Sequence, residues 1–341
     1  MQDSYHQIER IHWIDFARGL CMIAVVFYHT ESYYIDVYHV FKYDWLSNFL
    51  KAFFFLSGYL LFKRGENHDS TYLIYKLNRI LRSLIIPYFV FTLILAVPKC
   101  YAHGLDIGET LKNIIMGQAS WFVTTLILTE LCFISILHWC SKYKVLVLLL
   151  TSVLGLITAP YIDSITNYNP WCFKQALAAF IFLLLGYLYH QYEQHFRFFK
   201  QLYIVLLFFV LIIIMKVIAD KYNMEVSIYP VNISNMLFFL IDAIIGIALI
   251  ISFSQLISGS KLIEYTGKLS IIIYFLNGGV SVVTSKIMNN IGFGYDEQYY
   301  RVFIMFIVNY SIVLIISHII YHYLPFMIGR NYLNMSSSSF K

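Results

Sequence analysis

Residues 10–31 read RIHWIDFARGLCMIAVVFYHTE, and this stretch decides which class of fold the chain adopts. Its longest uninterrupted apolar run is too short to cross a bilayer, which requires about 20 residues. A spanning helix must therefore begin near Ile11 and include both Asp15 and Arg18. We expect residues 11–31 to form the first transmembrane helix, with ionisable groups inside the membrane.

One face of this expected helix carries three of its ionisable side chains. At about 100° per residue, Arg18 and His29 fall within about 20° of each other, and Asp15 lies within about 60° of both. Arg18 and His29 would be roughly 16 Å apart along the axis. Charged groups at such depth usually face a protein interior or a wet cavity and mark function. The alternative is an arginine that extends to the membrane surface, beside a satisfied aspartate, with an interfacial histidine at the other end.

The composition places most of the chain in a membrane. The 341 residues are 60% hydrophobic and 13% charged, whereas a soluble domain carries about 25% charge. The net charge of +5 is spread over many short loops, so we expect membrane lipid and no nucleic acid as a partner. The five cysteines show no metal or disulfide spacing and resemble small hydrophobic residues. The expected class is an all-α polytopic membrane protein.

The apolar segments predict about ten transmembrane helices within one integral-membrane domain, residues 1–341. The excess of Lys and Arg on one side of these segments places both termini in the cytoplasm. The first segment lacks a small-residue cleavage site, so we expect it to stay in the mature protein. Residues 331–341 are predicted to form a disordered tail. The expected spans are about 11–31, 46–63, 78–98, 119–139, 144–160, 172–190, 201–219, 233–253, 268–288 and 302–323.

The second and third segments contain two patterns with more than one interpretation. Ser57-Gly58 lies in an aromatic run without a GxSxG motif, which favours close helix packing over a nucleophile. Lys76, Arg79 and Arg82 follow one another at i, i+3 and i+6 where the third segment begins. They either anchor the helix at the cytoplasmic surface or hold a polyanion such as a nucleotide phosphate.

Ionisable residues in later segments also require partners. Glu130 lies near the middle of the fourth segment, so it is either protonated or paired with Arg18, His29 or a cation of the third segment. Asp242 raises the same question in the eighth segment. Lys174 lies at the outer mouth, where it either anchors the helix or meets a sugar or anionic headgroup.

The i, i+4 pair His318 and His322 has no acidic neighbour, so we interpret both as interfacial histidines and expect no metal. The chain also lacks a P-loop, Rossmann glycines and an HExxH motif.

Several of these stretches together resemble the integral-membrane acyltransferase-3 family. Asp15-x-x-Arg18-Gly19, followed by His29 eleven residues after Arg18, is similar to the first helix of that family. The resemblance covers about residues 8–280 and is closest to the stand-alone sugar O-acetylating branch, typified by fucose 4-O-acetylases. Further similar stretches are FFFLSGY (53–59), Arg79-x-x-Arg82 before Pro87-Tyr88, Trp121-Phe122, Pro170-Trp171 through Gly186-Tyr187, and TGKLSIIIY (266–274).

The resemblance implies a multi-pass acyltransferase of a bacterial inner membrane. It would transfer an acetyl or other small acyl group from acetyl-CoA to a sugar hydroxyl of an exopolysaccharide or its lipid-linked precursor, without a metal. His29 would be the base, since an imidazole can take up the hydroxyl proton near neutral pH, with Asp15 orienting Arg18 and Glu130 as a buried partner. The remaining candidates are Arg18, Lys76, Arg79 and Arg82 for the CoA phosphates, and Trp121, Lys174 and Asn277 for the acceptor.

One position departs from the family pattern. Many members have a histidine soon after Gly-Lys-x-Ser-x-x-x-Tyr, and Asn277 takes that place here. If that residue handles the acceptor, the acceptor differs; if it is catalytic, activity itself is in question. Transfer through an acyl-histidine, direct transfer, and a homo-oligomer all stay open.

Two other functions compete with the acyltransferase. A polytopic transporter would use Asp15, Arg18 and His29 as a proton relay, but it should also show broken helices and repeats, and apart from Pro87 the sequence shows little sign of them. A non-enzymatic partner in envelope polysaccharide assembly would use the polar face as an interface. The transporter should work without acetyl-CoA, and the partner protein should tolerate His29→Ala.

Overall fold

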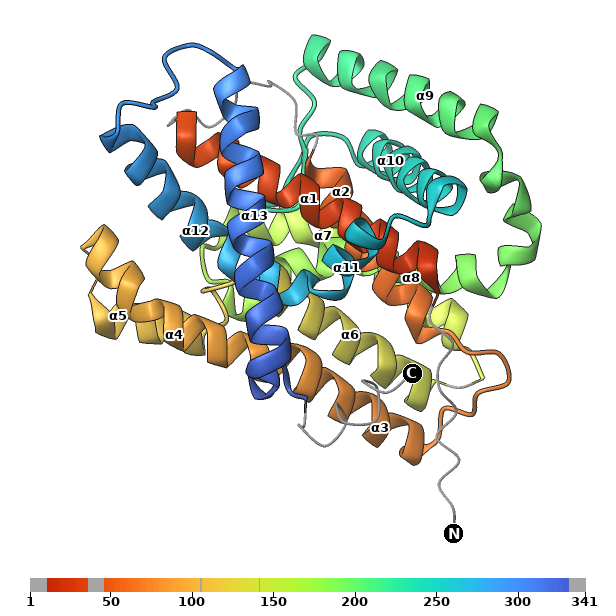
Figure 1. Ribbon diagram of the computed structural model, residues 1–341. Coiled ribbons are helices and arrows are strands. Elements are labelled where there is room, and N and C mark those ends of the chain that lie inside the picture. Colours follow the sequence, from red (N-terminus) through yellow and green to blue (C-terminus); the bar gives the residue numbers. More distant parts are fainter. Residues whose placement is uncertain (1–10, 36–45, 105, 141, 331–341) are drawn as a thin grey trace, which may run out of the picture.

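The computed structural model describes residues 11–35, 46–104, 106–140 and 142–330. This part of the chain is almost entirely helical, and eight helices in it are long and apolar enough to cross a membrane, which confirms the all-α polytopic class (Figure 1). The tail predicted for residues 331–341 lies outside it. The elements are α1 (His12–Ile35), α2 (Leu46–Leu61), α3 (Ser70–Ile80), η1 (Leu81–Ile85), α4 (Ile86–His103), α5 (Ile107–Ile115), α6 (Trp121–Trp139), α7 (Lys144–Ile165), η2 (Pro170–Cys172), α8 (Phe173–Gln191), η3 (Glu193–Lys200), α9 (Leu202–Lys221), β1 (Val226–Ser227), β2 (Asn232–Ile233), α10 (Met236–Ile257), α11 (Lys261–Lys268), α12 (Ser270–Asn290), α13 (Tyr300–Tyr323) and η4 (Pro325–Ile328).

Helix α1 lies at the centre of this arrangement (Figure 1). It packs against α2, α10, α11, α12 and α13. A helix surrounded on most sides can keep polar side chains away from lipid, because its neighbours supply hydrogen-bond partners. The charged first segment is therefore compatible with a membrane-embedded position.

Two glycines allow α1 and α11 to cross in contact. A Cβ at Gly267 would lie 2.8 Å from the carbonyl carbon of Asp15 and 2.9 Å from the backbone nitrogen of Gly19. A Cβ at Gly19 would lie 2.8 Å from the carbonyl carbon of Ile263. Real Cβ atoms essentially never lie within 3.0 Å of such atoms, so the crossing requires glycine on both helices.

The same device joins α2 to α8. A Cβ at Gly58 would lie 2.6 Å from the carbonyl carbon of Leu183, and one at Gly186 would lie 2.8 Å from that of Phe55. The Ser57-Gly58 pair thus has the packing role that the sequence favoured over a nucleophile.

Helices α3 and α4 form one continuous rod through the π-helix η1. Its 34 residues would extend about 50 Å, far more than the roughly 30 Å of a hydrocarbon core. The amphipathic α3, which begins with Asp69 accepting a hydrogen bond from the Tyr72 backbone N–H at 2.8 Å, therefore extends beyond the apolar part of the rod. The predicted span 78–98 covers only that apolar part.

Candidate functional site

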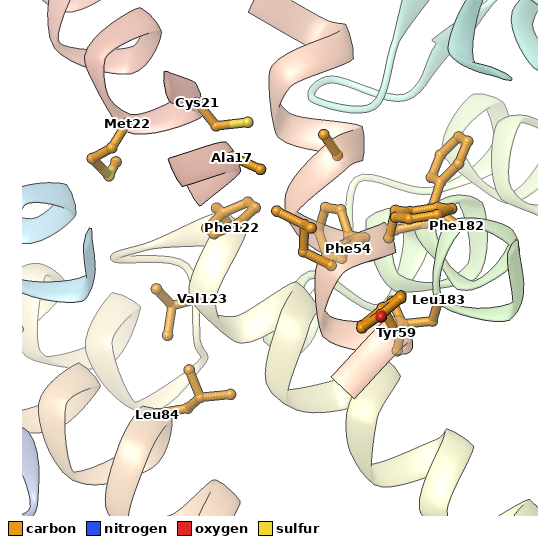
Figure 2. Close-up of a cluster of buried hydrophobic side chains, with 14 of the residues drawn as sticks. Ala17, Cys21, Met22, Phe54, Tyr59, Leu84, Phe122, Val123, Phe182 and Leu183 are labelled. Carbon is orange, nitrogen blue, oxygen red and sulfur yellow. The ribbon is translucent and has the colours of Figure 1, made fainter. Parts of the chain in front are cut away.

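Helix α1 directs its polar stripe towards the protein interior. Arg18, Met22, Val25 and His29 occupy positions i, i+4, i+7 and i+11. Met22 and Val25 are buried, at 1% and 3% exposure, and the two polar residues are partly buried. Figure 2 shows Met22 together with its neighbours Ala17 and Cys21 among buried side chains of the core. A stripe whose middle is buried in this way does not face lipid.

The crossing of α1 and α11 places two of the quoted stretches side by side. Asp15 and Gly19 lie against Gly267 of α11, so the α1 turn that carries Arg18 packs beside Thr266-Gly267-Lys268. Thr266 is itself held by the Tyr310 hydroxyl of α13 at 2.6 Å. Contacts with α11, which α13 holds in turn, therefore set the position of the α1 turn that carries Arg18.

Further cations gather at this end, which we call the basic end and define by Arg18, Arg79, Arg82, Lys268 and Arg330. Arg82 lies in the π-turn, a feature that often marks functional sites. The backbone of Gly329 packs against the carbonyl group of Arg82, which brings the following residue, Arg330, to the same place. Arg82 and Arg330 are exposed and Arg79 is partly exposed. A polyanion would meet several positive charges there.

Two of these cations, Lys268 and Arg330, were not predicted as site residues. Lys268 Nζ lies 5.3 Å from the centre of the Tyr321 ring, and the Arg330 guanidinium lies 4.6 Å from the same ring and donates to its hydroxyl. The signal for Lys268 was present, since it belongs to the quoted TGKLSIIIY stretch. Arg330 had none, because only the turn at Gly329 brings it to Arg82.

The Lys76 side chain is buried whereas Arg82 is exposed, although Lys76 also interacts electrostatically with Arg79. Its side chain is 6% exposed, with Nζ 5.1 Å from the centre of the Tyr72 ring, and it interacts electrostatically with Glu66 and Glu130. The reason is helical geometry, since positions i and i+6 point about 120° apart. Lys76 therefore balances interior acids, and its expected contact with phosphate finds no support in this placement.

Glu130 is 4% exposed and accepts a hydrogen bond from the Ser57 hydroxyl of α2. Its electrostatic neighbour Lys76 is one of the partners considered from the sequence, a cation of the third segment. This contact joins α6 to α2 and α3. Glu130 is thus a buried acid with a hydroxyl partner and a nearby positive charge, which makes it a structural link between helices.

The two residues that follow His29 are fixed to α12 and α13. The Thr30 hydroxyl accepts a hydrogen bond from Asn309 Nδ2 at 3.0 Å, and Asn309 also accepts from the Thr284 hydroxyl. Glu31 accepts a hydrogen bond from the Tyr299 hydroxyl at 2.7 Å. These bonds set the depth and rotation of α1 at His29.

Phe122 is the meeting point of three of the quoted stretches. Its ring centre lies 5.4 Å from that of Phe53, 5.2 Å from that of Phe54 and 5.4 Å from that of Tyr274. Figure 2 shows Phe122 between α1 and Phe54. Such ring contacts hold α2, α6 and α12 together around the inner face of α1. The adjacent Trp121 stacks on Tyr229 with ring centres 4.7 Å apart.

Asn277 is buried on the face of α12 that also carries Ser281 and Thr284, at i, i+4 and i+7. It is 1% exposed, and its Oδ1 has no hydrogen-bond partner within the part of the chain that the structure describes. Buried polar atoms are nearly always paired. An unpaired acceptor beside the polar contacts of α1 is available to a bound hydroxyl group.

Lys174 lies away from these residues. It is 2% exposed, with Nζ 3.0 Å from Asp163 Oδ1, and it also donates to the Thr166 carbonyl. These contacts hold the loop between α7 and α8 against the start of α8. Its expected contact with an acceptor finds no support in this placement.

Asp242 has two lysine partners. Its carboxylate lies 2.9 Å from Lys216 Nζ of α9 and 3.8 Å from Lys51 Nζ of α2. Lys51 and Asp242 are both completely buried. The sequence did not identify either lysine as a partner of Asp242, so this interior charge cluster was missed.

Comparison with known proteins adds one finding. A family model described as an acyltransferase domain matches residues 11–329. No curated protein and no solved structure matches the chain.

Proposed function

Because this chain belongs to the acyltransferase-3 family and is a membrane acyltransferase, we propose that it transfers an acetyl or other small acyl group from acyl-CoA to a sugar hydroxyl. The acceptor is a surface polysaccharide or its lipid-linked precursor, and the location is a bacterial inner membrane with the basic end in the cytoplasm. The observation that supports this best is the inward-facing stripe of α1, with Arg18 near one end and His29 near the other.

The basic end binds the donor. CoA is a polyanion, and arginine side chains bind phosphate through paired N–H groups. Arg79, Arg82 and Arg330 are at least partly accessible there, and Arg18 is partly buried beside the crossing of α1 and α11. The roughly 16 Å between Arg18 and His29 along the axis is a distance that an extended pantetheine arm can cover.

His29 removes the proton from the acceptor hydroxyl. The hydroxyl oxygen forms a bond with the thioester carbonyl carbon, the C–S bond breaks, and the proton held by the imidazole passes to the departing thiolate. An acyl-histidine formed first would give the same products in two steps. Asn277 and Trp121 contact the acceptor in this proposal, and the unpaired Oδ1 of Asn277 accepts a hydrogen bond from one of its hydroxyl groups.

The test measures acyl transfer in membranes that contain wild type, His29→Ala or Arg18→Ala. Labelled acetyl-CoA is supplied at the cytoplasmic face with an extract of host glycans. We expect label in glycan with wild type and its loss in both variants. The matched controls are His12→Ala, which removes an exposed histidine of the same helix, and Arg64→Ala, which removes an exposed loop arginine.

The outcomes separate the competing functions. Label that persists with His29→Ala at equal protein levels removes His29 from the mechanism. Substrate movement across the membrane without acetyl-CoA indicates a transporter, and glycan assembly that continues unlabelled with every variant indicates a non-enzymatic partner.

A further inference from the structure

Two neighbouring cavities lie on the side of the bundle where α1 begins, apart from both the basic end and the α1 stripe. One has a volume of about 230 Å³ and is lined by residues of α2, α8, η3 and α10. The other has a volume of about 250 Å³ and lies between η3 and the ends of α8 and α10. Both are lined by Tyr189 and Phe196, so they adjoin, and we call the two together the α8–α10 cleft. The ring contact of Trp13 with Tyr59, and the hydrogen bond of His190 with the Tyr59 backbone, place it at the end where α1 begins.

The two halves of the cleft differ in chemistry. The first is lined almost entirely by apolar side chains, including Phe199, Ile247 and Ile251. The second is lined by Glu193, Arg197, Lys200 and Gln255 among others. The short helix η3 produces this division, because it directs phenylalanines to one half and cations to the other. A ligand that fills both halves must itself be apolar at one end and polar at the other.

The polar half favours an anion with hydroxyl groups. It contains two cations and one carboxylate, and that carboxylate already accepts a hydrogen bond from the Tyr59 hydroxyl at 2.6 Å. Gln255 donates to the Tyr189 hydroxyl at 3.1 Å, while its Oε1 is buried without a hydrogen-bond partner among the described residues. Arg197 and Lys200 suit a phosphate, and the unpaired amide oxygen suits a hydroxyl donor beside it.

The surroundings decide which molecule of this kind is present. Helix α9 packs on α10 and η3 at the outer edge of the bundle (Figure 1), so the cleft lies close to the surrounding lipid. We propose that the α8–α10 cleft binds one anionic phospholipid with a hydroxyl-bearing headgroup, of which phosphatidylglycerol is the example. One acyl chain occupies the apolar half, and the phosphate lies between Arg197 and Lys200. The lipid thereby joins η3 and α10 to α8.

The test uses the full-length protein, purified in mild detergent and examined by native mass spectrometry and by thermal unfolding. Phosphatidylglycerol or phosphatidylcholine is added at matched concentrations. We expect one phosphatidylglycerol per protein, a higher midpoint temperature with it, and at least tenfold weaker retention of phosphatidylcholine. The double variant Arg197→Gln/Lys200→Gln should lose at least tenfold of the phosphatidylglycerol retention. Lys63→Gln/Arg64→Gln, which removes two exposed cations outside both cavities, should retain it.

Ala248→Phe fills the apolar half and should weaken retention of both lipids. If it does not fold, the two double variants on exposed residues still decide the matter. Equal retention of the two lipids, or equal losses in both double variants, would overturn the proposal, because general surface charge then explains the binding. The proposal would also be overturned if polyprenyl phosphate displaced phosphatidylglycerol when present at a tenth of the phosphatidylglycerol concentration. That result would assign the cleft to a lipid-linked acceptor.

Discussion

Replacing Gly267 by alanine should separate α11 from α1 and disable the enzyme. The new Cβ would overlap the Asp15 carbonyl oxygen and lie 2.8 Å from the carbonyl carbon, whereas ordinary contacts begin at 3.4 Å. All of these atoms belong to the backbone of α1, so a change of side-chain rotamer cannot relieve the overlap and the two helices must move apart. Overpacking of this kind costs about 1–3 kcal/mol. Arg18 lies on the turn that moves, so we also expect a loss of acyl transfer.

The matched control is Gly279→Ala in the neighbouring α12, where a Cβ meets nothing within 4 Å. Alanine inside a helix is favoured over glycine by about 0.5–1 kcal/mol, so this variant should be as stable as wild type or slightly more so. Thermal unfolding in detergent measures the loss of stability. Transfer of label from acetyl-CoA in membranes measures the loss of activity. If Gly267→Ala equals Gly279→Ala in both assays, the crossing does not position Arg18 and the reasoning is refuted.

Three other predictions follow from the contacts described above. Arg82→Ala and Arg330→Ala should each raise KM for acetyl-CoA by about tenfold, the value of one charged hydrogen bond, with kcat little changed; a change in kcat alone would argue against a donor site at the basic end. Lys51→Met should destabilise the protein by about 3 kcal/mol, because it removes a partner from the buried Asp242. Denaturant titration measures the free energy of unfolding, with Lys63→Met at an exposed position as the control. Asn309→Leu should cost about 1–3 kcal/mol through its lost bonds to Thr30 and Thr284, and an unchanged unfolding midpoint would contradict it.

Local patterns predicted that the chain consists of long apolar helices and that α1 has an inner face, but they did not predict the short helices α5 and α11. The fifth predicted span, 144–160, lies within α7. Hydropathy is informative here because a long apolar segment in lipid must satisfy its backbone hydrogen bonds internally, as a helix does. The spacing of Arg18 and His29 predicted a shared face, and the buried Met22 and Val25 between them show that this face is internal. Periodicity alone carries such information.

Contacts between distant segments were not predictable in this way. Lys51, Lys216 and Asp242 belong to three helices, and nothing near Lys51 in the sequence indicates that a lysine there will be completely buried. The π-turn at Leu81–Ile85 and the contact of Phe122 with Tyr274 also depend on how neighbouring helices pack, which the local sequence does not show. The amphipathic helix η3 was missed because it is short and follows α8 after a single residue.

The central position of α1 has a consequence for how the chain is made. This helix is synthesised first, yet Thr30 bonds a residue 279 positions later, and Glu31 bonds one 268 positions later. At roughly 5–20 residues per second, translation takes on the order of tens of seconds to cover that separation. Throughout this interval Thr30 and Glu31 have neither of these final partners. We therefore expect α1 to reach its final position only after α13 is made, and a chain truncated before α13 should be degraded as incomplete.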